Sequence, residues 1–580
     1  MLKYDIQNRN AFSCLNTNKN IFNFTTRSHQ ILVLFLLFLC FSACKNNQNK
    51  NEETLKIEAP KEDSTDISAI STKQFREFEV LDSRQMSRLD IWTPFNAAMS
   101  EFTTEDYERL KPLILDQDIL SLQSQITNGN LSYELLTKFY LYRIREFDRE
   151  NDLSLNSVIS INPMVIEEAR MKDKELKYNA NRHLIYGMPI LLKDNINASG
   201  MSTTAGAVAL RNNRTSDAFL VQQIKSAGGL ILGKANLSEW AYFFCGNCPS
   251  GYSALGGQTL NPYGRKLIDT GGSSSGSAVA VAANFCAAAV GSETSGSILS
   301  PSSQNSVVGL KPTIGLVSRS GVIPISETLD TAGPIAKTVG DAAILFDAMY
   351  GFDKDDKKAI RTNYTKGFYY GNLEKNAVEG KRFGAVKRLL EDTLYTQAIA
   401  SLKDLGATIV EIDETQVDLP NFIRLLNLDM KKDLPAYISN HANPSVKISN
   451  IQDVIDFNTQ DSVSFMPYGQ ALFRGIVADK GDAQYLRRIK DTLKTNGRKF
   501  FEQPFNAEKL DGFLSINNYH AGYAAVAEYP AITVPMGYTE NGAPKGLTFI
   551  ARPNQEKNLL KWAKTYEQAS KKRIAPVDYN

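Results

Sequence analysis

Two clusters of glycine and serine enclose a stretch of small apolar residues near the middle of the chain, and no other feature of the sequence constrains the fold as much. The stretch Ala278–Val290 is mostly alanine and valine. It is shorter than the roughly 20 residues that a helix needs to cross a bilayer. We predict a tightly packed interior helix here, because small side chains fit closely in a dense core. The clusters Gly271–Ser277 and Gly291–Ser297 therefore flank a buried element.

Helix and strand signals alternate along most of the chain, which indicates an α/β fold built from packed layers. No linker rich in Pro and Ser divides residues 120–576, so we expect one large domain there. Residues 415–500 carry more charge and less pattern, and we expect them to be mostly helical. The predicted strands are Met188–Leu192, Leu230–Leu232 and Thr408–Ile412, and the predicted helices are Ala218–Ala227, Leu394–Leu405, one capped by Ser132 and one running from Thr338 to Gly351.

The N-terminal residues resemble an export signal. The apolar run Ile31–Phe41 follows Arg27, and it is too short to span a membrane. Small residues then lead to Cys44, an order that resembles the lipobox of bacterial lipoproteins. That resemblance implies a signal peptide over residues 1–43, a lipid on Cys44, and anchoring in a bacterial cell envelope, periplasmic or associated with the outer membrane. The alternatives are a simple signal peptide and a buried helix.

Three further regions follow the signal. Residues 44–75 are rich in Asn, Lys, Glu, Asp and Ser. They bury too little apolar surface to offset the entropy of ordering, so we predict a flexible tether. Residues 76–119 are expected to pack on the core as an N-terminal extension, and residues 120–576 to form the functional domain.

Charge and histidine content exclude some function classes. The chain has 65 Lys+Arg against 63 Asp+Glu, a formal charge of +2. Such a balance argues against a nucleic-acid partner, since proteins that bind nucleic acids usually carry a basic excess. Four histidines argue against a metal site built from several of them. We expect neither a metal nor a cofactor.

Lys193 is a candidate base. It follows the apolar run Pro189–Leu192 and precedes Asp194. A lysine at the end of a buried strand is partly desolvated, which lowers the pKa of its ammonium group and makes a neutral amine available near pH 7. The alternative is a surface lysine that forms a salt bridge with Asp194.

The glycine and serine clusters supply the other groups that such a base requires. The first cluster gathers hydroxyls at a predicted helix start. In the second, consecutive N–H groups in a tight turn can form an oxyanion hole, and Ser297 at its end can be a nucleophile if a base reaches it. Each cluster alone could be an ordinary polar loop. Together with Lys193 they give a nucleophile, a base and an anion-binding turn without histidine, a known Ser-Lys variant of serine catalysis.

These segments resemble the amidase signature family from about residue 120 to 576. The matching segments are Gly187–Asn195, Gly271–Ala278, Gly291–Ile298, Gly309–Thr313 and Asp330–Pro334; Gly233–Trp240 and Gly256–Thr259 are most similar to the bacterial peptide amidases. The resemblance implies a large mixed β-sheet sandwiched by α-helices. It also implies a Ser-cisSer-Lys triad in which Lys193 is the base, Ser273 the bridging serine after a cis peptide bond, and Ser297 the nucleophile. Thr294, Ser295 and Gly296 would bind the oxyanion.

The chain departs from the family pattern at three positions. Glu293 replaces an Asp, Ser295 a Gly, and Leu299 an Arg that are frequent in the family. Because all three triad positions are filled, we expect an active serine amidohydrolase that forms an acyl-enzyme. We expect these departures to alter the substrate more than the chemistry.

The substrate class is also an expectation from the resemblance. Family members cleave C-terminal peptide amides, fatty amides, aryl amides or glutamine, and the peptide-amidase likeness favours a peptide carboxamide. Members that transfer glutamine nitrogen work in the cytoplasm with a partner subunit, which the export signal argues against. We therefore expect a small-molecule or peptide amide as substrate, no obligate protein partner, and membrane contact through the lipid on Cys44.

Two other functions compete with this interpretation. Gly272–Gly276 also fits G-x-S-x-G, the nucleophile elbow of α/β-hydrolases. That esterase needs a strand over Arg265–Thr270, which fits poorly. It also needs a downstream Asp and His, and His441 and His520 are the sole candidates for the histidine. Replacing both histidines should leave an amidase active. The second alternative is a surface lipoprotein that binds ligands on an inactive amidase scaffold.

Residues 240–248 add a cysteine pair and an aromatic cluster. Cys245 and Cys248 form a C-x-x-C, which lacks the second pair that a zinc site needs. A local disulfide and two unpaired thiols both remain possible outside the cytoplasm. Trp240 and the aromatic run 242–244 are expected in the core, with the alternative that they border a pocket. His183 and His520 are expected to be structural groups on loops.

Overall fold

The computed structural model describes residues 73–176, 181–365, 367–373 and 376–580. All of them belong to one compact unit, residues 59–580. The predicted signal peptide, Cys44 and nearly all of the predicted tether lie outside the described residues. Within the described ranges, no helix is both long enough and apolar enough to cross a membrane.

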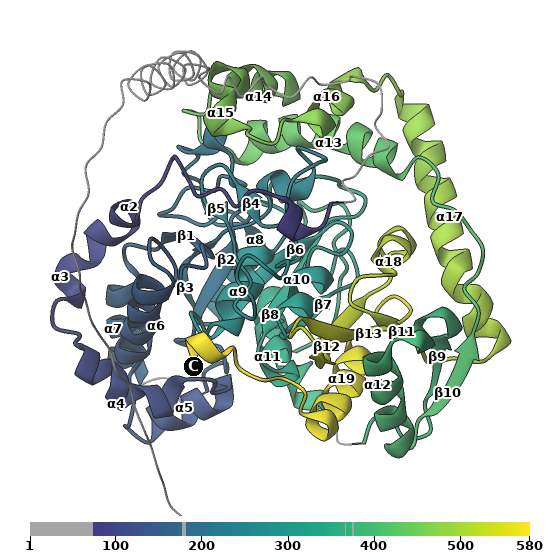
Figure 1. Ribbon diagram of the computed structural model, residues 1–580, viewed down its shortest axis with the longest axis horizontal. Coiled ribbons are helices and arrows are strands. Elements are labelled where there is room, and N and C mark those ends of the chain that lie inside the picture. Colours follow the sequence, from purple (N-terminus) through teal and green to yellow (C-terminus); the bar gives the residue numbers. More distant parts are fainter. Residues whose placement is uncertain (1–72, 177–180, 366, 374–375) are drawn as a thin grey trace, which may run out of the picture. The chain divides into compact units, whose positions relative to one another are not determined.

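An eleven-stranded mixed sheet runs through this unit in the order β1-β3-β2-β6-β8-β7-β12-β13-β11-β9-β10, and β4 and β5 form a separate pair (Figure 1). The strands β3, β2 and β6 are parallel, as are β11, β9 and β10, and the remaining pairs are antiparallel. The strands are β1 (Val158–Ile161), β2 (Pro189–Lys193), β3 (Leu230–Ala235), β4 (Tyr252–Ser253), β5 (Gly257–Gln258), β6 (Ala288–Glu293), β7 (Val308–Lys311), β8 (Thr331–Ala336), β9 (Arg382–Val386), β10 (Thr408–Ile412), β11 (Gly512–Ile516), β12 (Ala531–Tyr538) and β13 (Pro544–Ile550).

Every residue of the central strands β2, β3, β6, β7 and β8 is buried. Both faces of this part of the sheet are therefore covered, and helices provide the cover. This confirms the predicted α/β sandwich around a large mixed sheet. The helices are α2 (Arg88–Trp92), α3 (Asn96–Met99), α4 (Thr104–Ile114), α5 (Ile119–Thr127), α6 (Tyr133–Phe147), α7 (Val165–Glu175), α8 (Phe219–Ser226), α9 (Ser275–Ala282), α10 (Leu299–Gln304), α11 (Val339–Met349), α12 (Thr393–Asp404), α13 (Phe422–His441), α14 (Ile451–Asn458), α15 (Ser462–Phe465), α16 (Ala471–Ala478), α17 (Ala483–Ala507), α18 (Ala521–Ala527) and α19 (Glu556–Ser570).

The helix and strand boundaries in the structure confirm the elements that the sequence predicted most clearly. The predicted strands coincide with β2, β3 and β10, and the predicted helices with α6, α8, α11 and α12. Thr338 caps α11 as expected, since its hydroxyl oxygen accepts the Asp341 N–H at 3.1 Å. The N-terminal residues contribute to the same core as the sheet, because Phe75, Trp92 and Phe95 are buried within its main hydrophobic cluster.

The prediction for Ala278–Val290 is half wrong. Its first part ends α9, and its last part begins β6. The chain turns between them at Asn284, whose φ of 57° lies in the left-handed region that asparagine tolerates. The sequence misled because an element buried on all sides has no polar face, so its periodicity cannot distinguish a helix from a strand.

Residues 415–500 form a helical layer, as expected, and Figure 1 shows α13 to α16 side by side at the top. A second hydrophobic cluster joins this layer to the segment around Trp240 and to residues 323–329. Phe473 of α16 lies with its ring centre 5.3 Å from that of Trp240 and 5.0 Å from that of Phe244. The predicted core role is thus confirmed for Trp240, Phe243 and Phe244, whereas Tyr242 is half-buried at the edge of the same cluster.

Candidate active site

Lys193 is the last residue of β2 and is completely buried. Because β2 and β6 are parallel, both strands end at the same edge of the sheet. There the Lys193 Nζ donates hydrogen bonds to Ser273 Oγ at 2.8 Å and to the Ser292 carbonyl oxygen at 3.0 Å. The strand pairing therefore places the amine between the two serine clusters.

Burial lowers the pKa of Lys193 to about 7, against the weaker opposing effects of Asp330 and Glu293. The alternative in which Lys193 pairs with Asp194 is wrong. Asp194 forms its ion pair with the buried Lys234 at 2.9 Å. The Lys193 amine thus faces a hydroxyl and a carbonyl and has no carboxylate partner among the described residues, which favours its neutral form near pH 7.

The first serine cluster forms the loop before α9, and the Gly272–Ser273 peptide bond is cis. Ser273 is fully buried. Its carbonyl oxygen accepts the Ser238 N–H at 3.1 Å, and the next N–H, that of Ser274, donates to the Ser297 carbonyl at 3.1 Å. The two serine clusters are thereby joined through the main chain.

The second serine cluster forms a turn between β6 and α10. Glu293, at the end of β6, accepts the N–H groups of Ile298 and Leu299 at 2.8 and 3.1 Å through one carboxylate oxygen. Gly296 has a φ of 88°, a left-handed conformation that suits glycine. No acceptor among the described residues binds the N–H groups of residues 294–297. A turn with four free N–H groups is a ready anion site.

Asp330 fixes the start of this turn from outside. The Thr294 hydroxyl donates to one carboxylate oxygen at 2.6 Å, and the N–H groups of Ile325 and Ser326 donate to the other at 2.9 Å each. Sequence reasoning included Asp330 in a matching segment but assigned it no role. Its position follows from the antiparallel pairing of β6 with β8, which sets Glu293 opposite Thr331.

The structure brings together all six predicted site residues. Ser297 is half-buried, so its hydroxyl is open to a ligand, whereas Lys193 and Ser273 are fully enclosed. A proton relay from Ser297 through Ser273 to Lys193 needs two hydrogen bonds, and the one between Lys193 and Ser273 is present. Among the described residues no hydrogen bond joins the two serine hydroxyls. Of the departures from the family pattern, Ser295 is half-buried and Leu299 is fully buried in the core.

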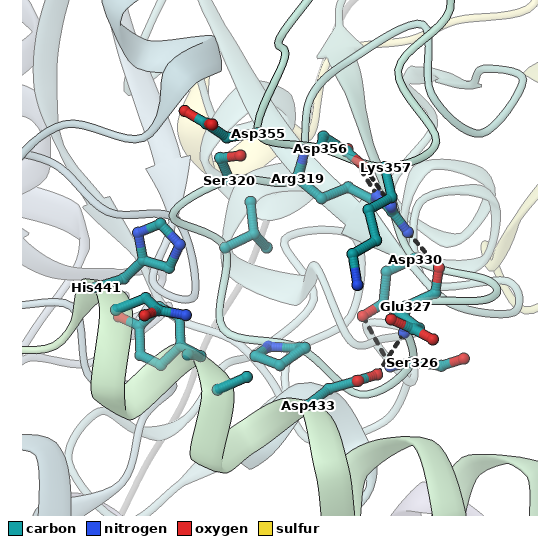
Figure 2. A pocket seen from close by; sticks show the side chains of 15 residues that line it. Arg319, Ser320, Ser326, Glu327, Asp330, Asp355, Asp356, Lys357, Asp433 and His441 are labelled. Carbon is teal, nitrogen blue, oxygen red and sulfur yellow. Dashed lines mark hydrogen bonds and ion pairs between the residues drawn. The ribbon is translucent and has the colours of Figure 1, made fainter. Parts of the chain in front are cut away.

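A cavity of about 200 Å³ is lined in part by Asp330 (Figure 2). Asp330 and Ser326 form one wall, and α13 forms another with Asp433 and His441. In this view Lys357 reaches into the cavity from the side opposite α13. The cavity is separate from Ser273 and Ser297, which do not line it, but it shares Asp330 with the oxyanion turn.

The competing nucleophile elbow is not supported. Arg265–Thr270 contains no strand. The buried His520 lies near Ser515 and Glu414 instead of Ser273: its Nδ1 is 2.6 Å from Ser515 Oγ and its Nε2 is 2.7 Å from Glu414 Oε1. Cys245 and Cys248 form a disulfide, one of the two alternatives left open by the sequence.

Replacing His520 with alanine is expected to lower the free energy of unfolding by roughly 1–3 kcal/mol, because the buried Ser515 hydroxyl would lose its 2.6 Å hydrogen bond and keep only a 3.5 Å contact with the Ile516 carbonyl oxygen. Chemical denaturation of purified variants measures this. The matched control is His441→Ala, an exposed histidine whose loss should change stability by no more than about 0.5 kcal/mol. Equal stabilities of the two variants would contradict a structural role for His520.

Comparison with known proteins places this chain in one class of enzymes. The amidase family model matches residues 136–560. A probable amidase of Arabidopsis thaliana is 34% identical over 80% of this chain and 92% of its own length. An amidase family protein from Bacillus anthracis has a TM-score of 0.81 and 36% identity over 85% of this chain and 99% of its own. The peptide amidase of Stenotrophomonas maltophilia has a TM-score of 0.75 and 37% identity over 80% and 98% of the two chains.

The fold and these matches define an enzyme that hydrolyses amide bonds. The chain belongs to the amidase signature family.

Proposed function

We propose that this enzyme hydrolyses the C-terminal carboxamide of a peptide to a carboxylate and ammonia, through an acyl-enzyme on Ser297. The observation that carries the proposal is the 2.8 Å hydrogen bond from the buried Lys193 amine to Ser273 Oγ, next to a turn of free N–H groups. A buried amine with a pKa of about 7 is a competent base at neutral pH.

In the first half-reaction, neutral Lys193 takes the proton of Ser273 as Ser273 takes the proton of Ser297. The Ser297 oxygen forms a bond to the carbonyl carbon, and the N–H groups of residues 294–297 stabilise the resulting oxyanion. When the C–N bond breaks, the relay returns the proton to the nitrogen, which leaves as ammonia. Donors fixed by Glu293 and Asp330 need no reorganisation as the charge develops.

In the second half-reaction, after ammonia has left, water attacks the carbonyl carbon of the ester on Ser297 and the carboxylate product is released. The same relay removes a proton from water and later returns one to the Ser297 oxygen, so the enzyme is regenerated with a neutral lysine. No metal or cofactor is needed for either step.

The peptide substrate is supported by the likeness to the peptide amidase of Stenotrophomonas maltophilia. Ammonia release from an amidated dipeptide tests it, with free glutamine, a fatty amide and an anilide as the competing substrates. Preference for the amidated dipeptide by kcat/KM is the expected result. Preference for any of the others would assign a different amide to the same chemistry, and no release from all four would refute the proposed activity.

An inactive binding protein on the same scaffold would not react with a fluorophosphonate probe. We expect covalent labelling of Ser297, located by mass spectrometry, because the probe requires an activated serine hydroxyl. Unlabelled wild-type protein that still binds amidated peptides would support the binding function instead.

We further propose that Cys44 carries a lipid and anchors the enzyme in the cell envelope. The apolar run before Cys44 and the small residues next to it support this. Metabolic labelling with an alkynyl fatty acid should tag the wild type in the membrane fraction and leave Cys44→Ser untagged. Label that persists in Cys44→Ser would refute this lipidation site.

A further inference from the structure

The turn that follows β11 lies directly against the oxyanion turn. A Cβ built on Gly296 would be 2.9 Å from Asn518 Nδ2 and 3.4 Å from the Cβ of Ala521, the first residue of α18. The Asn518 carboxamide therefore lies in contact with Gly296, one residue before Ser297. No sequence motif pointed to Asn518, because its position depends on the pairing of β11 within the sheet.

Residues on both sides of Asn518 are held in place. The Asn517 N–H donates to the Gly546 carbonyl at 2.9 Å, and its side-chain oxygen accepts the Gly546 N–H at 2.8 Å. On the other side, His520 lies between Ser515 and Glu414 at 2.6 and 2.7 Å. These contacts fix the backbone that carries Asn518.

The Asn518 carboxamide itself is not used by the fold. It is half-buried, and neither its oxygen nor its nitrogen has a hydrogen-bond partner among the described residues. The neighbouring Asn517 and His520, by contrast, use their side chains in hydrogen bonds. An amide with free donors, carried by a fixed backbone and in contact with a turn whose N–H groups are also free, fits a group that binds a ligand at that turn.

We infer that Asn518 is a further catalytic residue whose side-chain N–H group donates to the substrate carbonyl oxygen as it becomes an oxyanion on Ser297. The side chain adds one donor to the main-chain N–H groups of residues 294–297. It acts on the oxygen, and the proton relay through Ser273 and Lys193 is unaffected. This inference rests on the proposed function, because it needs an acyl carbon attacked at Ser297.

Asn518→Asp and Asn518→Leu test the donor. Both variants keep nearly the same side-chain shape, but the first retains acceptors alone and the second has no polar atom. We expect kcat/KM for the amidated dipeptide to fall about 100-fold in both, the lower range for loss of one oxyanion donor. The matched control is Asn541→Asp at an exposed turn, which makes the same chemical change and should keep wild-type kinetics.

A second readout separates this role from a structural one. A peptide aldehyde adds to Ser297 as a tetrahedral adduct with an oxyanion, whereas the intact amide bound by Ser297→Ala protein keeps a neutral carbonyl. We expect aldehyde affinity to fall by the same factor as kcat/KM in Asn518→Asp, with the affinity for the intact amide, measured in the Ser297→Ala background, changed less than threefold. Equal losses of aldehyde and amide affinity would overturn the inference, as would wild-type kinetics in Asn518→Asp. A wild type that releases no ammonia from any amide would instead refute the proposed function.

Discussion

Ser297→Ala is expected to lower ammonia release by at least about 10⁴-fold while the protein remains folded. The substitution removes only the side-chain hydroxyl, and without that hydroxyl no acyl-enzyme can form. The Ser297 side chain makes no hydrogen bond among the described residues and is half-buried, so its loss leaves no unpaired group in the core. Steady-state ammonia release measures the effect, and circular dichroism with thermal unfolding verifies the fold.

The matched control for Ser297→Ala is Ser295→Ala, in the same turn and equally half-buried. Ser295 contributes its N–H group to the oxyanion turn, and that group is retained in alanine. We expect its turnover to stay within about threefold of the wild type, well below the effect of losing a donor. If Ser297→Ala kept the rate of Ser295→Ala, another residue would be the nucleophile.

Lys193→Met is expected to cost about 10³–10⁴-fold in turnover, because the base of the relay is replaced by an apolar side chain of similar length. The same substitution is expected to flatten the dependence of stability on pH between pH 7 and 10. The folded pKa is about 7, below the ordinary value of 10.5. In that window the unfolded wild type binds a proton that the folded state does not, which favours unfolding, and methionine removes this difference.

The pH profile of the wild type follows from the same shift. Because the reaction needs the neutral amine, kcat/KM should be low below the pKa of about 7, rise through it and level off above it. Stability measured against pH supplies the control: the wild type should gain stability relative to Lys193→Met as pH rises from 7 towards 10.5. A flat activity profile from pH 5 to 9 would show that Lys193 does not act as the base.

Sequence patterns predicted the parts of the site that depend on short segments. Lys193 at the end of an apolar strand, and the glycine-rich turns around Ser273 and Ser297, are local features with local causes. The disulfide could not be decided from spacing, since a C-x-x-C is compatible with both oxidised and reduced states. The helix over Ala278–Val290 failed because full burial erases the periodic signal.

Groups whose positions depend on sheet pairing were missed. Asp330 reaches Thr294 because β8 runs antiparallel to β6, and Asn518 reaches Gly296 across more than two hundred residues of chain. His520 lies in the turn after β11 as a structural group, as predicted, but its partner Glu414 could not be predicted because it comes from the loop after β10. A single sequence contains no local trace of such contacts.

The parallel pairing of β2 with β6 also has an evolutionary consequence. It ties the base and the turn that carries Ser297 to neighbouring strands of one sheet, so a mutation that separates them must break the core. The helical layer of α13 to α17 attaches through its own hydrophobic cluster. Selection can therefore diversify that layer while the reactive machinery is inherited unchanged.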